Sequence, residues 1–185
     1  MDFDLPLSLN VDGVDRSIYA DFRDVLTIVM ACNDGELSKE EKAFVILNNL
    51  YVDDIEELGD INEAYKKACR FIDWDKEYEV REDAPKLIDW KKDYNHIMSA
   101  VNKSSNVVDV RELPFMHWWT FLGLFQERGE CHFSTIVNVR DKLNKGKKLE
   151  PHEKEFLRNN REDIMLKDET NEMFETEFLG GDICG

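Results

Sequence analysis

The sequence lacks two things that would widen its range of functions: long apolar runs and positive charge. No apolar run approaches the length needed to span a bilayer. Lysine and arginine total 24 against 40 aspartates and glutamates, so the formal net charge is −16. Carboxylates in this excess repel a phosphate backbone, which argues against nucleic-acid binding and favours basic partners. The N-terminus, MDFDLPLSLN, lacks the basic start of a signal peptide. We expect a protein that stays in the cytoplasm where it is made, with no membrane partner.

Paired cysteines and catalytic motifs are also lacking. The four cysteines are far apart, with no C-x-x-C motif, so reduced thiols in a cytosolic protein are the simplest account of them. Cys131 and His132 are adjacent, but no second pair stands at ligand spacing, so we expect no metal site. A glycine-rich phosphate loop and a G-x-S-x-G motif are both missing. Because nothing assembles a nucleophile, a base and an oxyanion site, we expect no enzyme and no cofactor.

One segment that is present, residues 113–126, is almost entirely apolar (LPFMHWWTFLGLFQ). Pro114 suits the first turn of a helix, where its missing N–H is not needed. Because apolar side chains cover nearly the whole circumference, such a helix must be enclosed by protein or lie at an interface. We interpret the segment as a central core helix in which His117 is a satisfied histidine. The alternative is that one edge, with one of the two adjacent tryptophans, stays available to a partner. The residues assigned to this partner-binding edge are Phe115, Trp118, Trp119, Phe121 and Leu122.

Residues 1–73 are expected to form an N-terminal lobe, a β-hairpin followed by three helices. Apolar and polar residues alternate on both sides of Asp12-Gly13, a dipeptide preferred in two-residue hairpin turns. Asp21 and Asp60 are placed to cap the first and third helices, and Ser38 with Glu41 forms a capping box before the second. Residues at helical spacing are expected to face inward: Phe22, Val25, Leu26, Val29 and Met30, then Ala43, Phe44, Leu47, Leu50 and Tyr51, then Ile61, Ala64, Tyr65, Ala68 and Ile72.

A C-terminal helical lobe is expected over residues 87–165. The preceding residues, 74–86, are charged and include a proline, which is typical of a loop between lobes. Apolar spacing predicts a fourth helix at the start of this lobe, then the central helix, a sixth helix after Gly129 and a seventh from Pro151. Residues 166–185 are acidic and are expected to be a mobile tail. The predicted fold is mainly α, a helical bundle of about seven helices with an N-terminal β-hairpin.

Positive charge is concentrated in one basic patch, at the end of the predicted sixth helix. The patch consists of Arg140, Lys142, Lys145, Lys147 and Lys148. Cations at a helix C-terminus are favourable, each by ~0.3–1 kcal/mol, and this is the simplest interpretation. Two others stay open: a docking site for the acidic tail or an acidic partner surface, and nucleic-acid binding, which the net charge disfavours.

Several motifs follow one another in a fixed order in the second half of the chain. They are DWKKDY at 89–94, LPF at 113–115, HWWTFL at 117–122, GKKL at 146–149 and the segment 156–161. In this order and spacing they resemble a family of bacteriophage proteins encoded in the tail gene modules of siphophages and prophages of Gram-positive bacteria. Members of that family are described as tail-assembly-chaperone-like. The hairpin and the helix that begins at Asp21 resemble the same family more loosely.

The resemblance implies a helical, non-enzymatic assembly factor, made in the cytoplasm of the bacterial host and absent from the mature virion. It would bind the tape-measure protein, help to recruit tail-tube subunits, and self-associate along its client. An acidic helical protein could hold the apolar stripe of a long helical client against its own helices. The alternative from a different class is an acidic phage-encoded inhibitor that imitates DNA and blocks a host DNA-binding or defence protein, which the charge of −16 motivates.

Overall fold

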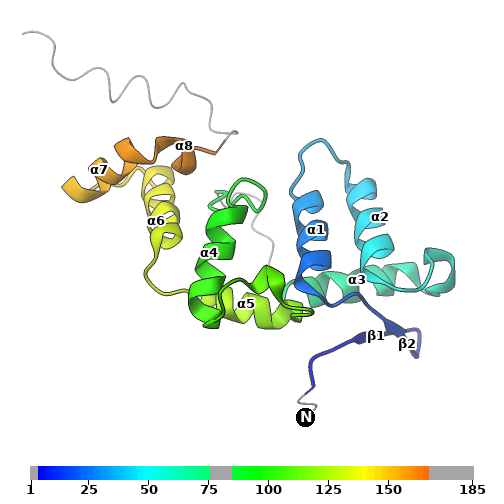
Figure 1. Ribbon diagram of the computed structural model, residues 1–185. Helices are drawn as coiled ribbons and strands as arrows, with labels where there is room; N and C mark the ends of the chain where they lie inside the picture. The colour runs from blue at the N-terminus through cyan, green and yellow to red at the C-terminus, as the bar shows by residue number, and fades with distance from the viewer. Residues whose placement is uncertain (1–3, 76–84, 167–185) are drawn as a thin grey trace, which may run out of the picture. The chain divides into compact units, whose positions relative to one another are not determined.

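The computed structural model describes residues 4–75 and 85–166 (Figure 1). Within these residues the chain is mainly helical, with eight α-helices and one two-stranded antiparallel sheet at the N-terminal end. This confirms the predicted fold class. The chain divides into two compact units, residues 1–134 and 135–185. The predicted mobile tail lies outside the described residues from residue 167 onward. Among the described residues, no helix is both long enough and apolar enough to cross a membrane.

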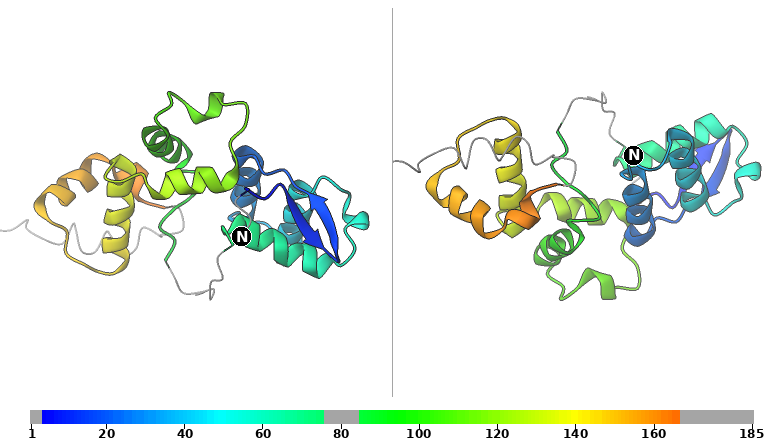
Figure 2. Two further views of the ribbon diagram at one scale, coloured as in Figure 1. Left: turned by 90° about the horizontal axis from the view of Figure 1, so that it is seen from below. Right: turned by 90° about the horizontal axis from the view of Figure 1, so that it is seen from above.

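The N-terminal hairpin pairs β1 (Ser8–Val11) with β2 (Val14–Ser17), in a register that places Val11 opposite Val14. Asp12 and Gly13 form the two-residue turn, with φ of 51° and 77°, as the predicted Asp-Gly turn requires. The backbone N–H of Asp12 donates to the Glu63 carboxylate at 2.9 Å, which ties the turn to α3 (Ile61–Ile72). Figure 2 shows the hairpin lying against this helix. That contact supplies the support that an isolated hairpin lacks.

The helices of the first half begin where capping predicted. Asp21 accepts from the backbone N–H of Arg23, Ser38 and Glu41 form the predicted capping box, and Asp60 caps the third helix. The elements of this half are α1 (Phe22–Cys32), α2 (Lys39–Leu50), the 3₁₀-helix η1 (Ile55–Glu57) and α3.

Three of the residues expected to face inward here are exposed, and the prediction was wrong for them. Phe44 is 58% exposed, Ile61 is 38% exposed and Tyr65 is 37% exposed. On α2 the buried stripe is Ile46, Leu47 and Leu50, so it is rotated around the helix relative to the predicted stripe. Apolar spacing located the helix but did not fix which side packs against its neighbours.

The central helix is shorter than predicted. It begins at Trp118, because the residues before it run extended beside the start of α1. The N–H of Phe22 donates to the Met116 carbonyl at 2.9 Å, and the N–H of Trp118 donates to the Ala20 carbonyl at 2.8 Å. This long-range pairing replaces the helical turn expected from Pro114. The elements of this part are α4 (Tyr94–Ser105), the 3₁₀-helix η2 (Val110–Glu112), α5 (Trp118–Gln126) and α6 (His132–Asn144).

Helices α1 to α5 share one core, so the observed division of the chain differs from the predicted lobes 1–73 and 87–165. The ring of Phe121 on α5 stacks on Phe22 of α1, with centroids 4.8 Å apart. The charged segment 74–86 connects two parts of one unit, and its residues 76–84 lie outside the described residues. The division falls within α6, after Ser134.

The second unit contains the rest of α6, α7 (Pro151–Asn159) and the short α8 (Arg161–Ile164), which the sequence did not predict. Pro151 stands in the first turn of α7, as expected, and Glu150 and Glu153 form a capping box there. The core of this unit is small and consists of Ile136, Val139, Leu149 and Ile164, with Leu143, Phe156 and Leu157 packed around it.

Candidate functional site

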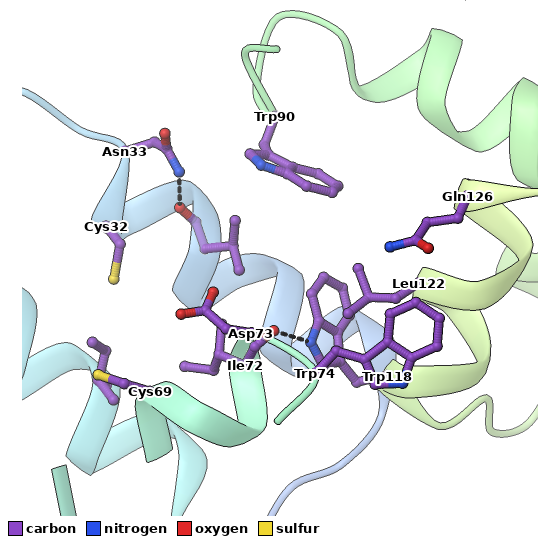
Figure 3. Close-up of a pocket in the computed structure, with 12 residues that line it drawn as sticks. Cys32, Asn33, Cys69, Ile72, Asp73, Trp74, Trp90, Trp118, Leu122 and Gln126 are labelled. Carbon is purple, nitrogen blue, oxygen red and sulfur yellow. Dashed lines mark hydrogen bonds between the residues drawn. The ribbon is translucent and has the colours of Figure 1, made fainter. Parts of the chain in front are cut away.

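The candidate site is a cavity of about 400 Å³ in the first unit, lined by residues of α1, α3 and α5, by Ile46 of α2, and by the segments after α3 and before α4 (Figure 3). Its volume lies near the lower end of the range for small-ligand pockets. One group of lining residues is aromatic and apolar: Trp74, Trp90, Trp118 and Leu122. A second group is polar and includes Cys32, Cys69, Asp73 and Gln126. The cavity can therefore hold an elongated side chain with both apolar and polar parts.

The two adjacent tryptophans of α5 hold the end of α3. The indole N–H of Trp118 donates to the carbonyl of Ile72, and that of Trp119 donates to the carbonyl of Phe71, both at 2.8 Å. Phe71 and Ile72 are the last two residues of α3, where carbonyls have no partner within the helix. The tryptophan pair thus caps α3 and fixes one wall of the cavity.

Of the five residues assigned to the partner-binding edge, two are core residues. Trp118 is 1% exposed and Phe121 is fully buried, so neither side chain can form a contact surface, and this part of the assignment is revised. Trp119 and Leu122 are half-buried, and Leu122 lines the cavity. Phe115 precedes α5 and is 51% exposed. The accessible part of the predicted edge is therefore Phe115 with parts of Trp119 and Leu122.

His117 is a structural histidine, as the sequence indicated. Its Nδ1 accepts from the backbone N–H of Trp119 at 3.0 Å, which caps α5, and its Nε2 lies 2.9 Å from the carbonyl of Pro6. Only the neutral tautomer with the proton on Nε2 satisfies both partners. Burial lowers the pKa of His117, which favours this neutral form. The ring holds the first turn of α5 and the N-terminal segment together, so it has no nitrogen left for acid–base chemistry.

The polar part of the cavity carries one carboxylate and two thiols. Asp73 follows the last residue of α3, and burial raises the pKa of its carboxyl. Among the described residues, Asp73 has no ion-pair partner, whereas Asp75 two positions on pairs with Arg70 at 2.6 Å. Burial also raises the pKa of the Cys32 and Cys69 thiols, so both are poor nucleophiles at neutral pH.

Sequence reasoning missed the contributions of Asp73, Trp74 and Trp90 to this cavity. Asp73 and Trp74 follow a helix end, where Trp74 takes the left-handed conformation with φ of 60°. Trp90 lies in the DWKKDY motif, and its ring centroid is 5.5 Å from that of Phe125 and 6.3 Å from that of Trp118. The sequence signal that could have pointed to the cavity was Trp74, a large aromatic residue at the start of the otherwise charged segment 74–86.

A second cavity of about 300 Å³ in the first unit contains the adjacent pair Cys131 and His132 together with His96. The ring centroids of His96 and His132 are 5.3 Å apart. Two imidazoles supply half of the four ligands that a structural zinc site uses. His96 comes from α4 and was not found from sequence, because its partner lies far along the chain.

The basic patch, in the second unit, is mostly engaged in local contacts. Arg140 is 2% exposed and donates to the carbonyls of Ile164 and Asp163 at the end of α8. Lys142 pairs with Glu153 at 2.6 Å, and Lys145 with Asp141 at 2.6 Å. Lys147 and Lys148 are exposed. Of the residues assigned to the basic patch, these last two lysines are therefore the ones still available for a docking contact.

Comparison with known proteins bears on the whole first unit and most of the second. The family model described as Bacteriophage Gp15 protein matches residues 1–166 of the 185-residue chain. No match was found among curated proteins or among solved structures. The match covers both the cavity and the motifs that carried the resemblance to bacteriophage proteins. The chain belongs to the Bacteriophage Gp15 protein family.

Proposed function

We propose that the protein is a tail-assembly-chaperone-like factor. It binds the tape-measure protein, tail-tube subunits or both during siphophage tail morphogenesis, acts in the cytoplasm of the bacterial host, and is not retained in the mature virion. Membership of a bacteriophage family supports this role. A mainly helical fold with a net charge of −16 supports it as well, because like charge keeps complexes of many copies dispersed.

The observation that carries the proposal is the cavity to which Trp74, Trp90 and Leu122, all half-buried, contribute accessible surface. A preformed concave site with rigid aromatic walls is suited to an anchoring side chain from a helical segment. The exposed Phe115 offers a further apolar contact in the same unit. Each copy needs only modest affinity, because many copies bound along one extended client gain avidity.

We further propose a non-enzymatic role. The titratable groups of the cavity are the two thiols, held protonated by burial, and the carboxyl of Asp73. A thiol needs to be a thiolate to act as a nucleophile, and the raised pKa of each opposes this. The cavity therefore favours holding a side chain over transforming a substrate.

The DNA-mimic alternative receives less support. It would need carboxylates presented in regular rows on the surface. Asp21, Asp60 and Asp109 instead accept hydrogen bonds from the backbone at the first turns of helices. Such acids are explained by helix capping and dipole stabilisation.

Co-expression with the tape-measure protein of the same phage tests the proposal. We expect the two to co-purify from cell lysate. Leu122→Glu places a charge in the cavity and should abolish co-purification, while Phe44→Ser, which changes an exposed phenylalanine on α2, should leave it intact. Far-UV circular dichroism of both variants should match the wild type. Full binding by a folded Leu122→Glu variant would show that the cavity is not the binding site. Failure of the wild type to bind either tail protein would refute the proposed function.

A further inference from the structure

We infer that the cavity between α1, α3 and α5 receives a lysine or arginine side chain of the client, with its aliphatic stem against the half-buried indoles of Trp74 and Trp90 and its charged head at Asp73. The inference rests on the proposed function and deepens it by naming the chemistry of the client's anchor. It is carried by the position of Asp73 in a cavity that also presents two half-buried tryptophans, Trp74 and Trp90.

Asp73 stands where a negative charge is unfavourable. It caps the C-terminus of α3, where the helix dipole is negative and a cation is preferred. Asp73 is an exposed residue that also lines the cavity, so only a part of its hydration is replaced by indole and aliphatic carbon. A cation bound beside this carboxylate would offset both the helix dipole and the lost hydration.

The protein itself does not supply that cation in the described residues. The neighbouring Asp75 pairs with Arg70, and Glu63 on the same helix pairs with Lys67. Lys42 lies near enough to Cys32 to favour its thiolate, but it forms no ion pair with Asp73. Burial raises the pKa of Asp73, as expected for a carboxyl without a nearby positive charge. The ion-pairing capacity of Asp73 is therefore open to a ligand.

The walls of the cavity suit the rest of such a side chain. Figure 3 shows the carboxylate of Asp73 and the rings of Trp74, Trp90 and Trp118 around one space. Indole faces attract lysine and arginine cations, and long basic side chains bury their methylene stems along apolar surface. A purely hydrocarbon side chain would satisfy the walls but would desolvate Asp73 without pairing it. The net charge of −16 draws a basic client toward the protein in the first place.

The inference can be tested without knowing the client segment. The probe is N-acetyl-arginine amide, compared with N-acetyl-citrulline amide, which keeps the shape but not the charge, and with N-acetyl-norleucine amide, which keeps only the apolar stem. Each is titrated at millimolar concentrations into the ¹⁵N-labelled full-length protein. The indole N–H signals of Trp74, Trp90 and Trp118 report on binding. Asp73→Asn removes the carboxylate, and Asp54→Asn is the matched control, because Asp54 is an exposed residue before η1 whose side chain makes no cap hydrogen bond.

The arginine probe should shift the three indole signals and bind about tenfold more tightly than the citrulline or norleucine probe. Asp73→Asn should remove this preference, and Asp54→Asn should keep it. Equal binding of the three probes, no binding of the arginine probe, or shifts confined to residues outside the cavity would each overturn the inference. If the arginine preference fails while the wild-type protein still co-purifies with the tape-measure protein, only the inference is lost and the proposed function stands.

Discussion

The tryptophan pair of α5 provides the sharpest prediction about stability, because the two side chains make the same hydrogen bond in different surroundings. Trp118→Phe removes the donor to the Ile72 carbonyl and leaves space in the core, since Trp118 is 1% exposed. Loss of a hydrogen bond from a partly desolvated carbonyl together with a core volume change should cost about 2–4 kcal/mol. Trp119→Phe removes the equivalent bond to Phe71, but Trp119 is half-buried and water can replace it, so the cost should be about 0.5–1.5 kcal/mol.

Thermal and urea denaturation of the two variants measure these costs. A loss of 1 kcal/mol lowers Tm by about 2–4 °C in a protein of this size, so Trp118→Phe should lower Tm by roughly 4–16 °C and Trp119→Phe by roughly 1–6 °C. The exchange of backbone amides at the end of α3 should accelerate in both. A Trp118→Phe variant with wild-type stability would refute the assignment of this tryptophan to the core, and equal losses for the two variants would refute the reasoning from burial.

Three further predictions concern charge. Because burial lowers the folded-state pKa of His117, its contribution to stability is fully present above about pH 6.5 and is lost as the pH falls through the lowered pKa. His117→Asn should therefore flatten the dependence of Tm on pH between about 7.5 and 5.5. The hydrogen bond from Lys142 lowers the pKa of Glu153, so its contribution is present above the ordinary glutamate value of about 4.3 and is lost below it; Glu153→Gln should reduce stability at neutral pH and show a smaller acid-induced loss than the wild type. Asp73→Asn removes a negative charge from the C-terminus of α3 and should stabilise the unliganded protein by about 0.3–1 kcal/mol in urea denaturation, whereas a clear destabilisation would show that Asp73 has a structural partner.

Local chemistry made much of the fold predictable from sequence. The Asp12-Gly13 turn, the caps at Asp21 and Asp60, and the proline that opens α7 were all identified because each satisfies backbone groups within a few residues. These signals depend on neighbours in sequence, and no tertiary contact is needed to recognise them.

The site depended on contacts between residues far apart in the chain. Helix α5 begins at Trp118, later than predicted, because residues near 116 pair with residues near 21. Helical periodicity relates residues only a few positions apart and so could not indicate this pairing. The sequence indicated a core helix and left open that one of the two tryptophans is available to a partner, and the structure shows both N–H groups bound to the end of α3. Asp73 could not be predicted as part of the cavity, because it is one of many carboxylates around the charged segment 74–86 and no sequence motif distinguishes it from them.

The central claim is that the client enters the cavity between α1, α3 and α5. Photocrosslinking tests it most directly, with a benzoylphenylalanine introduced at Gln126, an exposed residue that lines the cavity, or at Phe44 as the exposed control on α2. In cells that co-express the tape-measure protein, we predict a crosslink from position 126 and none from position 44. A crosslink from position 44 alone, or equal crosslinks from both, would contradict the assignment of the cavity as the binding site.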